Sequence, residues 1–249
     1  MLLFCMAALP LAITSVDVMN TGHMHGASYY VQFFRDKFTM FQCAGFAWTA
    51  HSQWGEDVML MERYFCNLRG GTYVELGAEN GVGFSNSLFY EDHLGWSGVL
   101  IEPSDKFTEL QRNRRKPTSK LFHVGVCPDA QRFFTCERCH GKNHGLMPCK
   151  SLKSIFKQAG LSFISFFSLD VEGGELIVLQ TMDWNVPVCI WEVEMLFNDT
   201  KSKLVHDTLL SRGYKHAFHI LGGNEVYEHE HLRDCLLNST QGMSNAMVV

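Results

Sequence analysis

The sequence has no excess of basic residues and no internal repeat, and each absence excludes a class of protein. Its 249 residues include 21 Lys and Arg against 26 Asp and Glu, a net charge of -5, which argues against a broad nucleic-acid-binding surface. The one basic cluster, Arg112 to Lys116, fits the end of a surface helix, where cations interact favourably with the helix dipole. No unit of about 20 to 50 residues recurs, which excludes a solenoid. The length fits one large domain, and an apolar content of 46% is enough for a packed core.

The opening stretch, MLLFCMAALPLAITS, lacks the length of a membrane span and the basic residues with which a typical signal peptide begins. Its apolar core and the small residues after it nevertheless resemble a signal peptide with a cleavage site, although the first basic residue is Arg35. N-glycosylation sequons begin at Asn198 and Asn238. A secretory or extracellular location, with membranes of that pathway nearby, and a cytoplasmic location therefore both stay open. If the stretch is retained, we expect it to form a helix packed on the core.

Cysteine is abundant, and four of the nine cysteines gather around the segment CERCHGKNHGLMPC. Three interpretations stay open. The segment matches a haem-attachment pattern, C-x-x-C-H, and its C-x-x-C pair is typical of zinc sites. In an oxidising compartment the cysteines would instead form disulfides, with Cys127 as a further partner, and this is the interpretation that we favour over a bound metal. The candidate zinc ligands are Cys136, Cys139, His144 and Cys149.

From Gly71 onward, five apolar strand-like runs each precede a helical pattern, and two last runs, YKHAFHIL and NEVYEHE, meet at the hairpin signal GGN. This alternation predicts an α/β fold with a mainly parallel sheet covered on both faces and one strand made antiparallel by the terminal hairpin. We divide the chain into an N-terminal segment at 1–50 with an extra helix, one domain at 51–235 and a tail at 236–249. The cysteine-rich insert follows the third strand, at the edge where such sheets bind ligands, and could act as a lid.

The stretch GTYVELGAENGVGFSNS begins as a strand and breaks into Gly77, Gly81 and Gly83 before a helical run. Glycines at such a turn let the backbone approach a ligand closely, although the turn could also be merely tight. No Lys follows, which excludes a P-loop, and the spacing G-x-x-x-G-x-G differs from the dinucleotide fingerprint. Glu79 would repel a diphosphate, whereas S-adenosylmethionine has no phosphate and carries cationic sulfonium and ammonium groups. The turn therefore favours S-adenosylmethionine over NAD.

Glu102 ends a second expected strand, GVLIEP. A carboxylate at this place can accept hydrogen bonds from both ribose hydroxyls of a nucleoside. Since NAD would need the same carboxylate, Glu102 indicates a nucleoside without choosing the cofactor. A solvated strand end is the alternative.

A second acidic block, SLDVEGGEL, follows the apolar run FISFF, which predicts a central buried strand. Asp170 comes at the carboxyl end of that strand, and Glu172 and Glu175 follow around two glycines. Such carboxylates can hold the amine of the cofactor, take a proton from a hydroxyl or help to bind a divalent cation. We choose Asp170 first as the general base, and capping of the next helix is the alternative for all three.

Glu192 and Glu194 alternate with apolar residues in CIWEVEM, so both point to one face of a strand. If that strand is central, the two acids could line an acceptor pocket, and if it is an edge they would be exposed.

Three blocks together resemble the FkbM-type methyltransferases, in particular the branch that includes Star-like proteins of animals. The blocks are SQWGEDVML, GTYVELGAENGVGFSNSLFYEDHLGWSGVLIEPS and FFSLDVEGGELIVLQTMDW. The resemblance covers about residues 52–230. It implies a class I, Rossmann-like seven-stranded fold, S-adenosylmethionine as the methyl donor and transfer to a hydroxyl oxygen.

The resemblance also implies roles for individual positions. Glu102 matches the ribose-binding acid. The D-V-E-G-x-E block is matched by Asp170, Glu172 and Glu175, with Gly174 where others often carry a bulkier residue. The cofactor motif is matched by Glu75, Gly77, Ala78 and Gly81, and Glu79 replaces a common Asn or Asp.

Three functions follow as hypotheses. The first is an O-methyltransferase acting on a small molecule, glycan or lipid, without a nucleic-acid partner. The second is a non-catalytic Star-like trafficking or binding protein that keeps the fold. The third, an NAD-dependent oxidoreductase, is disfavoured by the glycine spacing.

Overall fold

The computed structural model describes residues 50–66, 68–113, 117–129, 131, 133–135, 146–195, 200–220 and 222–241. The expected signal peptide, the extra helix before residue 50, the end of the basic cluster and the sequon at Asn198 lie outside these residues. So do Cys136, Cys139 and His144 of the cysteine-rich insert.

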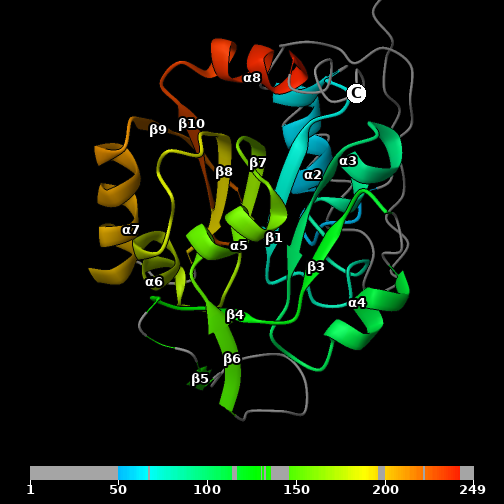
Figure 1. Cartoon of the computed structure of the whole chain (residues 1–249). Coiled ribbons are helices and arrows are strands. Elements are labelled where there is room, and N and C mark those ends of the chain that lie inside the picture. Colours follow the sequence, from blue (N-terminus) through cyan, green and yellow to red (C-terminus); the bar gives the residue numbers. More distant parts are fainter. Residues whose placement is uncertain are drawn as a thin grey trace, which may run out of the picture.

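One seven-stranded sheet forms the centre of the molecule (Figure 1). Its strand order is β3-β2-β1-β7-β8-β10-β9, and neighbours pair in parallel except at β10, which is antiparallel to both β8 and β9. The prediction of a mainly parallel sheet with one strand reversed by a terminal hairpin is confirmed. The strands are β1 (Thr72–Leu76), β2 (Ser97–Ile101), β3 (Lys120–Phe122), β7 (Ile164–Leu169), β8 (Val188–Glu194), β9 (Tyr214–Ile220) and β10 (Asn224–His229).

Helices cover both faces of the sheet, and each face has its own apolar core. Alternation along β1 places Val74 in one core and Tyr73 in the other. The core that contains Val74 is covered by α5 (Leu152–Ala159), α6 (Glu175–Gln180) and α7 (Thr200–Ser211). The core that contains Tyr73 is covered by α2 (Glu56–Leu60), the π-helix η1 (Met61–Phe65), α3 (Leu88–His93), α4 (Phe107–Asn113) and α8 (Leu232–Gln241).

Helix α5 shows how local sequence sets these elements. The Ser151 hydroxyl caps its first turn by accepting a hydrogen bond from the Ser154 N–H at 3.1 Å, and Gly160 ends it in a left-handed conformation at φ 68°. Its buried residues recur at helical spacing, so one stripe faces the core. They are Leu152, Ile155, Phe156 and Ala159.

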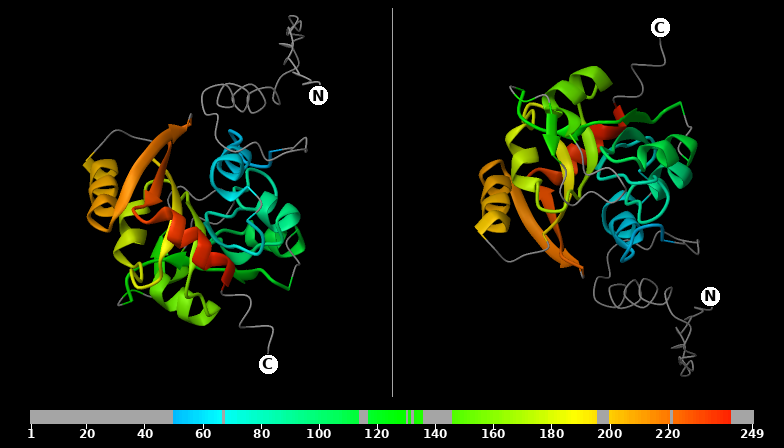
Figure 2. Two further views of the ribbon diagram at one scale, coloured as in Figure 1. Left: turned by 90° about the horizontal axis from the view of Figure 1, so that it is seen from above. Right: turned by 90° about the horizontal axis from the view of Figure 1, so that it is seen from below.

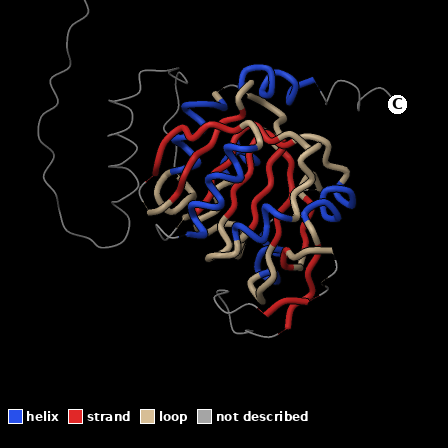
Figure 3. The backbone as a smooth tube through the Cα atoms, turned by 90° about the vertical axis from the view of Figure 1, so that its left-hand side faces the viewer, coloured by secondary structure: helices blue, strands red, loops and turns tan. Residues whose placement is uncertain are grey.

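A small second sheet projects from one end of the main sheet, at the bottom of Figures 1 and 3. Its order is β4-β6-β5, and the Cys127–Cys149 disulfide ties it together next to β4 and within β6. The sequence KLFHVGV, expected as one strand, is therefore two, because β3 pairs with β2 whereas Gly125 pairs with Cys149. The strands are β4 (Gly125–Val126), β5 (Phe133–Thr135) and β6 (Leu146–Lys150).

Helix α8 is joined to the beginning of β8 by a second disulfide, Cys189–Cys235. It lies across the opposite end of the sheet from the small sheet, at the top of Figure 1 and nearest the viewer in the left panel of Figure 2. The expected boundary between the domain and the tail, at residue 235, falls within this helix. Among the described helices, none combines the length and the apolar character that a membrane span needs.

Candidate functional site

The glycine turn directly follows β1 and is held against the ends of both neighbouring strands. The Gly77 and Ala78 N–H groups donate to the Ile101 carbonyl of β2 at 3.1 and 3.2 Å, and the Gly81 N–H donates to the Ala78 carbonyl at 2.8 Å. Gly77 has φ 91°, and a Cβ there would lie 1.9 Å from the Asp170 carbonyl oxygen on the other side. Position 77 therefore requires glycine because the main chains of β1 and β7 come together there.

Glu102 braces this turn from the end of β2. It is buried, and its Oε2 accepts a hydrogen bond from the Glu79 N–H at 2.7 Å while its Oε1 accepts one from the Ser104 N–H at 2.7 Å. Glu79 itself has a positive φ of 45°, a strained conformation for a residue with a side chain. Each Glu102 oxygen retains a further lone pair, so the carboxylate can still accept bonds from a ligand's hydroxyls.

Glu75 lies inside the sheet rather than at its rim, although it belongs to the expected cofactor motif. Its Oε1 accepts from the Asn86 N–H at 3.0 Å, and its Oε2 accepts from the hydroxyls of Ser85, at 3.0 Å, and Ser87. Glu75 thus anchors the segment that leads from the glycine turn into α3.

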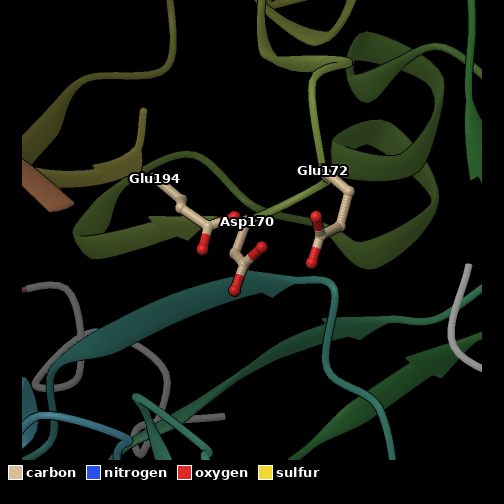
Figure 4. A group of neighbouring side chains, drawn as sticks. All are labelled: Asp170, Glu172 and Glu194. Carbon is tan, nitrogen blue, oxygen red and sulfur yellow. The ribbon is translucent and has the colours of Figure 1, made fainter. Parts of the chain in front are cut away.

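Three carboxylates from two strand ends gather on the other side of the turn (Figure 4). Asp170 follows β7, Glu194 ends β8, and Glu172 approaches from the loop after Asp170, with one oxygen of each within 4.8 Å of the others. Burial, and then the hydrogen bond with Asp170, raise the pKa of Glu194 to about 9. Near neutral pH Glu194 is therefore protonated and shares this proton with Asp170 in a hydrogen bond.

The remaining acid of the second block has a structural role. The Glu175 Oε1 accepts a hydrogen bond from the Gly173 N–H at 2.8 Å just before α6 begins, and burial raises the pKa of Glu175. Glu172 has φ 56°, so the chain turns sharply between Asp170 and α6.

Strand β8 lies between β7 and β10, so its two acids are not at an exposed edge. Glu192 sits next to Ser168 in the register, is 1% exposed, and neither of its oxygens has a hydrogen-bond partner among the described residues. Burial raises its pKa well above the ordinary value, and the nearby carboxylates of Glu56 and Asp57 add to the effect. Glu194, two residues on, reaches the acidic group at the sheet edge.

Sequence reasoning missed Glu56 and Asp57 of α2 as members of this acidic region. The Glu56 Oε1 accepts from the Asn224 side-chain amide at 2.8 Å, and Asn224 pairs with Glu194 in the sheet register. Asp57 accepts from the Ser52 hydroxyl at 2.7 Å. The block SQWGEDVML contains both acids, and its position in the resemblance was the signal that could have singled them out.

A family model identifies the chain at this point. The model of the methyltransferase FkbM domain matches residues 75–236, which include the glycine turn, Glu102 and the acids at the ends of β7 and β8. The chain belongs to the FkbM methyltransferase domain family. No curated protein matches the sequence.

Solved structures resemble this FkbM domain distantly. They include fibrillarin from Aeropyrum pernix with bound S-adenosyl-L-methionine, which is 10% identical with a TM-score of 0.43 over 65% of this chain and 67% of that one. The human methyltransferase 10 domain containing protein is 11% identical with a TM-score of 0.45 over 83% and 95%. Human methyltransferase-like protein 13, in complex with SAH, is 14% identical with a TM-score of 0.41 over 76% and 88%. Scores this low carry no argument, and the assignment rests on the family match and the sheet.

Two groups in the FkbM domain were considered as metal ligands, and they differ. Cys149 is disulfide-bonded to Cys127 and offers no thiolate, while the other three candidate zinc ligands lie outside the described residues. Asp170, Glu172 and Glu194 have oxygen ligands spaced for a hard cation, although the proton on Glu194 must leave first.

Proposed function

We propose that this FkbM domain is an S-adenosylmethionine-dependent O-methyltransferase whose acceptor is a hydroxyl of a small molecule, glycan or lipid. The family supports methyl transfer. The observation that carries the proposal is the meeting of two sites at Gly77, where the turn braced by Glu102 touches the main chain of Asp170. A ligand held at the turn would therefore lie next to the candidate base.

The residues at the turn fit this cofactor. A Cβ at Gly77 would collide with the Asp170 carbonyl, so a glycine keeps the turn packed against the end of β7, and Glu102 keeps lone pairs for two ribose hydroxyls. The turn carries the carboxylates of Glu79 and Glu102, which suit a cationic ligand better than a diphosphate. When bound, S-adenosylmethionine would supply a methyl group on a cationic sulfur.

Asp170 would take the proton of the acceptor hydroxyl. As that oxygen forms its new bond to carbon, it must lose its proton, and a positioned carboxylate accelerates this loss. Glu194 holds the shared proton near neutral pH and donates to Asp170, which leaves the carboxylate of Asp170 able to accept. Glu172 faces the same space and would orient the acceptor or assist in the proton transfer.

The test combines binding and turnover on matched variants. Calorimetry should show that the chain binds S-adenosylmethionine, and tighter binding of NAD would overturn the cofactor assignment. Incubation with methyl-labelled cofactor and fractions of small molecules, glycans and lipids should then label one acceptor. Asp170→Asn should bind the cofactor but lose labelling, whereas Glu109→Gln, an exposed change on α4, should keep both. Binding without labelling of any fraction would favour the non-catalytic alternative.

A further inference from the structure

The disulfides of this protein hold elements that a large apolar core already supports. Cys127 and Cys149 are 1% and 6% exposed, Cys189 and Cys235 are 0% and 7% exposed, and Cys66 is disulfide-bonded as well. Small secreted domains need disulfides because they lack a core, but this fold has apolar cores on both faces of its sheet. The core therefore does not require these disulfides, and their presence indicates the compartment in which the chain folds.

Bonds of this kind form and persist in oxidising compartments, and in the cytosol such thiols are kept reduced. The two bonds join segments 22 and 46 residues apart, and their sulfurs are shielded once the fold is complete. Oxidation must therefore take place while the chain folds, before the sulfurs are covered.

Asn238 of the sequon Asn238-Ser239-Thr240 is placed to receive such a modification. It is exposed on α8, three residues beyond the buried Cys235. Cys235 is bonded to Cys189, the second residue of β8, so α8 lies at the amino end of that strand. The candidate acids Asp170 and Glu194 lie at the carboxyl ends of β7 and β8, and Figure 1 shows α8 and the small sheet at opposite ends of the molecule.

We propose that the chain matures in the secretory lumen and carries an N-linked glycan on Asn238. The side-chain amide nitrogen of Asn238 forms a bond to the anomeric carbon of a lipid-linked oligosaccharide and loses one proton. The bond between that carbon and the lipid diphosphate breaks, and the diphosphate leaves. A glycan at this place leaves the cofactor edge of the sheet open.

The second sequon provides a contrast. Asn198 comes four residues after Glu194, so it can be at most about 14 Å along an extended chain from the acid at the site. A glycan there would stand beside the acceptor, and we assign the glycan to Asn238 alone.

The experiment uses the full chain, with its own amino terminus, expressed in cultured animal cells. Digestion with peptide N-glycosidase should lower its apparent mass in a single step and convert Asn238 to Asp, which peptide mass spectrometry detects. Thr240→Ala destroys the sequon and should remove the step, whereas the matched Ser239→Ala keeps the sequon and should retain it. Asn198→Gln should leave the step unchanged.

Several results would overturn the proposal. They are an intact step in Thr240→Ala, a step lost only in Asn198→Gln, and the absence of any step from the wild-type chain. Thiol labelling under denaturing conditions gives an independent readout of the compartment. Peptides with Cys127, Cys149, Cys189 and Cys235 should react only after reduction, and labelling without reduction would contradict maturation in the lumen.

Discussion

The carboxylates on the two sides of the glycine turn differ in the donors that face them. Glu75 accepts hydrogen bonds from an N–H group and two hydroxyls, and Glu102 accepts one from a backbone N–H group on each oxygen. Glu192 has no partner among the described residues, and Glu194 shares a proton with Asp170. Donors therefore decide which of these carboxylates serve as fixed acceptors and which hold protons. In the proposed function, one sheet edge would contain a binding half and a proton-transfer half.

The largest effect should come from the proton-transfer half. Asp170→Asn removes the proposed base while keeping its shape, so the rate of methyl transfer should fall about 10²–10⁴-fold, the usual contribution of general base catalysis. Cofactor affinity should change little, since the proposed ribose contact with Glu102 stays intact. Single-turnover labelling measures the rate and calorimetry measures the affinity. A loss of both would mean that Asp170 also binds the cofactor.

The same substitution made in each half should have opposite effects on stability. Glu75→Leu leaves two hydroxyls and an N–H without their acceptor and should lower the free energy of unfolding by about 1–3 kcal/mol. Glu192→Leu removes an unpartnered buried carboxyl and should raise it by about 1–3 kcal/mol. Denaturant unfolding measures both, and destabilisation by Glu192→Leu would show that Glu192 has an unseen partner.

Glu102→Ala should act on binding more than on folding. The loss of the acceptor for two ribose hydroxyls should weaken cofactor binding by about 1–3 kcal/mol, or roughly 5- to 150-fold. Calorimetry checks the affinity and thermal unfolding checks the fold. Parental affinity in this variant would mean that Glu102 only braces the turn.

The last effect concerns pH. The folded protein keeps the Glu194 proton up to a pKa of about 9, whereas the unfolded chain releases it near the ordinary glutamate pKa of 4.5. Between these values the folded state binds more protons, so the contribution of Glu194 to stability falls as the pH rises. The free energy of unfolding of the wild type should therefore fall relative to that of Glu194→Gln as the pH rises from about 5 to about 8.5. Denaturant unfolding of both proteins at each pH measures the difference. If the difference in free energy of unfolding between the two proteins does not change with pH, the shared proton is not on Glu194.

Much of this arrangement could be predicted from the sequence, because it is local. Alternating apolar runs predicted the sheet, and the rule that ligands meet strand ends predicted Glu102 and Asp170 as neighbours of the turn. The split of KLFHVGV into β3 and β4 could not be predicted, since it depends on pairing between Gly125 and Cys149. The contact of Glu56 with Asn224 could not be predicted either, because 168 positions separate the two residues in the sequence.

The disulfide at the base of the small sheet has a consequence for how this family can change. Its Cα atoms are 5.7 Å apart and enclose a stretch whose ends cannot separate. A loop closed in this way becomes only about 0.6 kcal/mol costlier when its length doubles. Sequence between Cys127 and Cys149 can therefore be exchanged or lengthened while the sheet and the cofactor turn stay as they are.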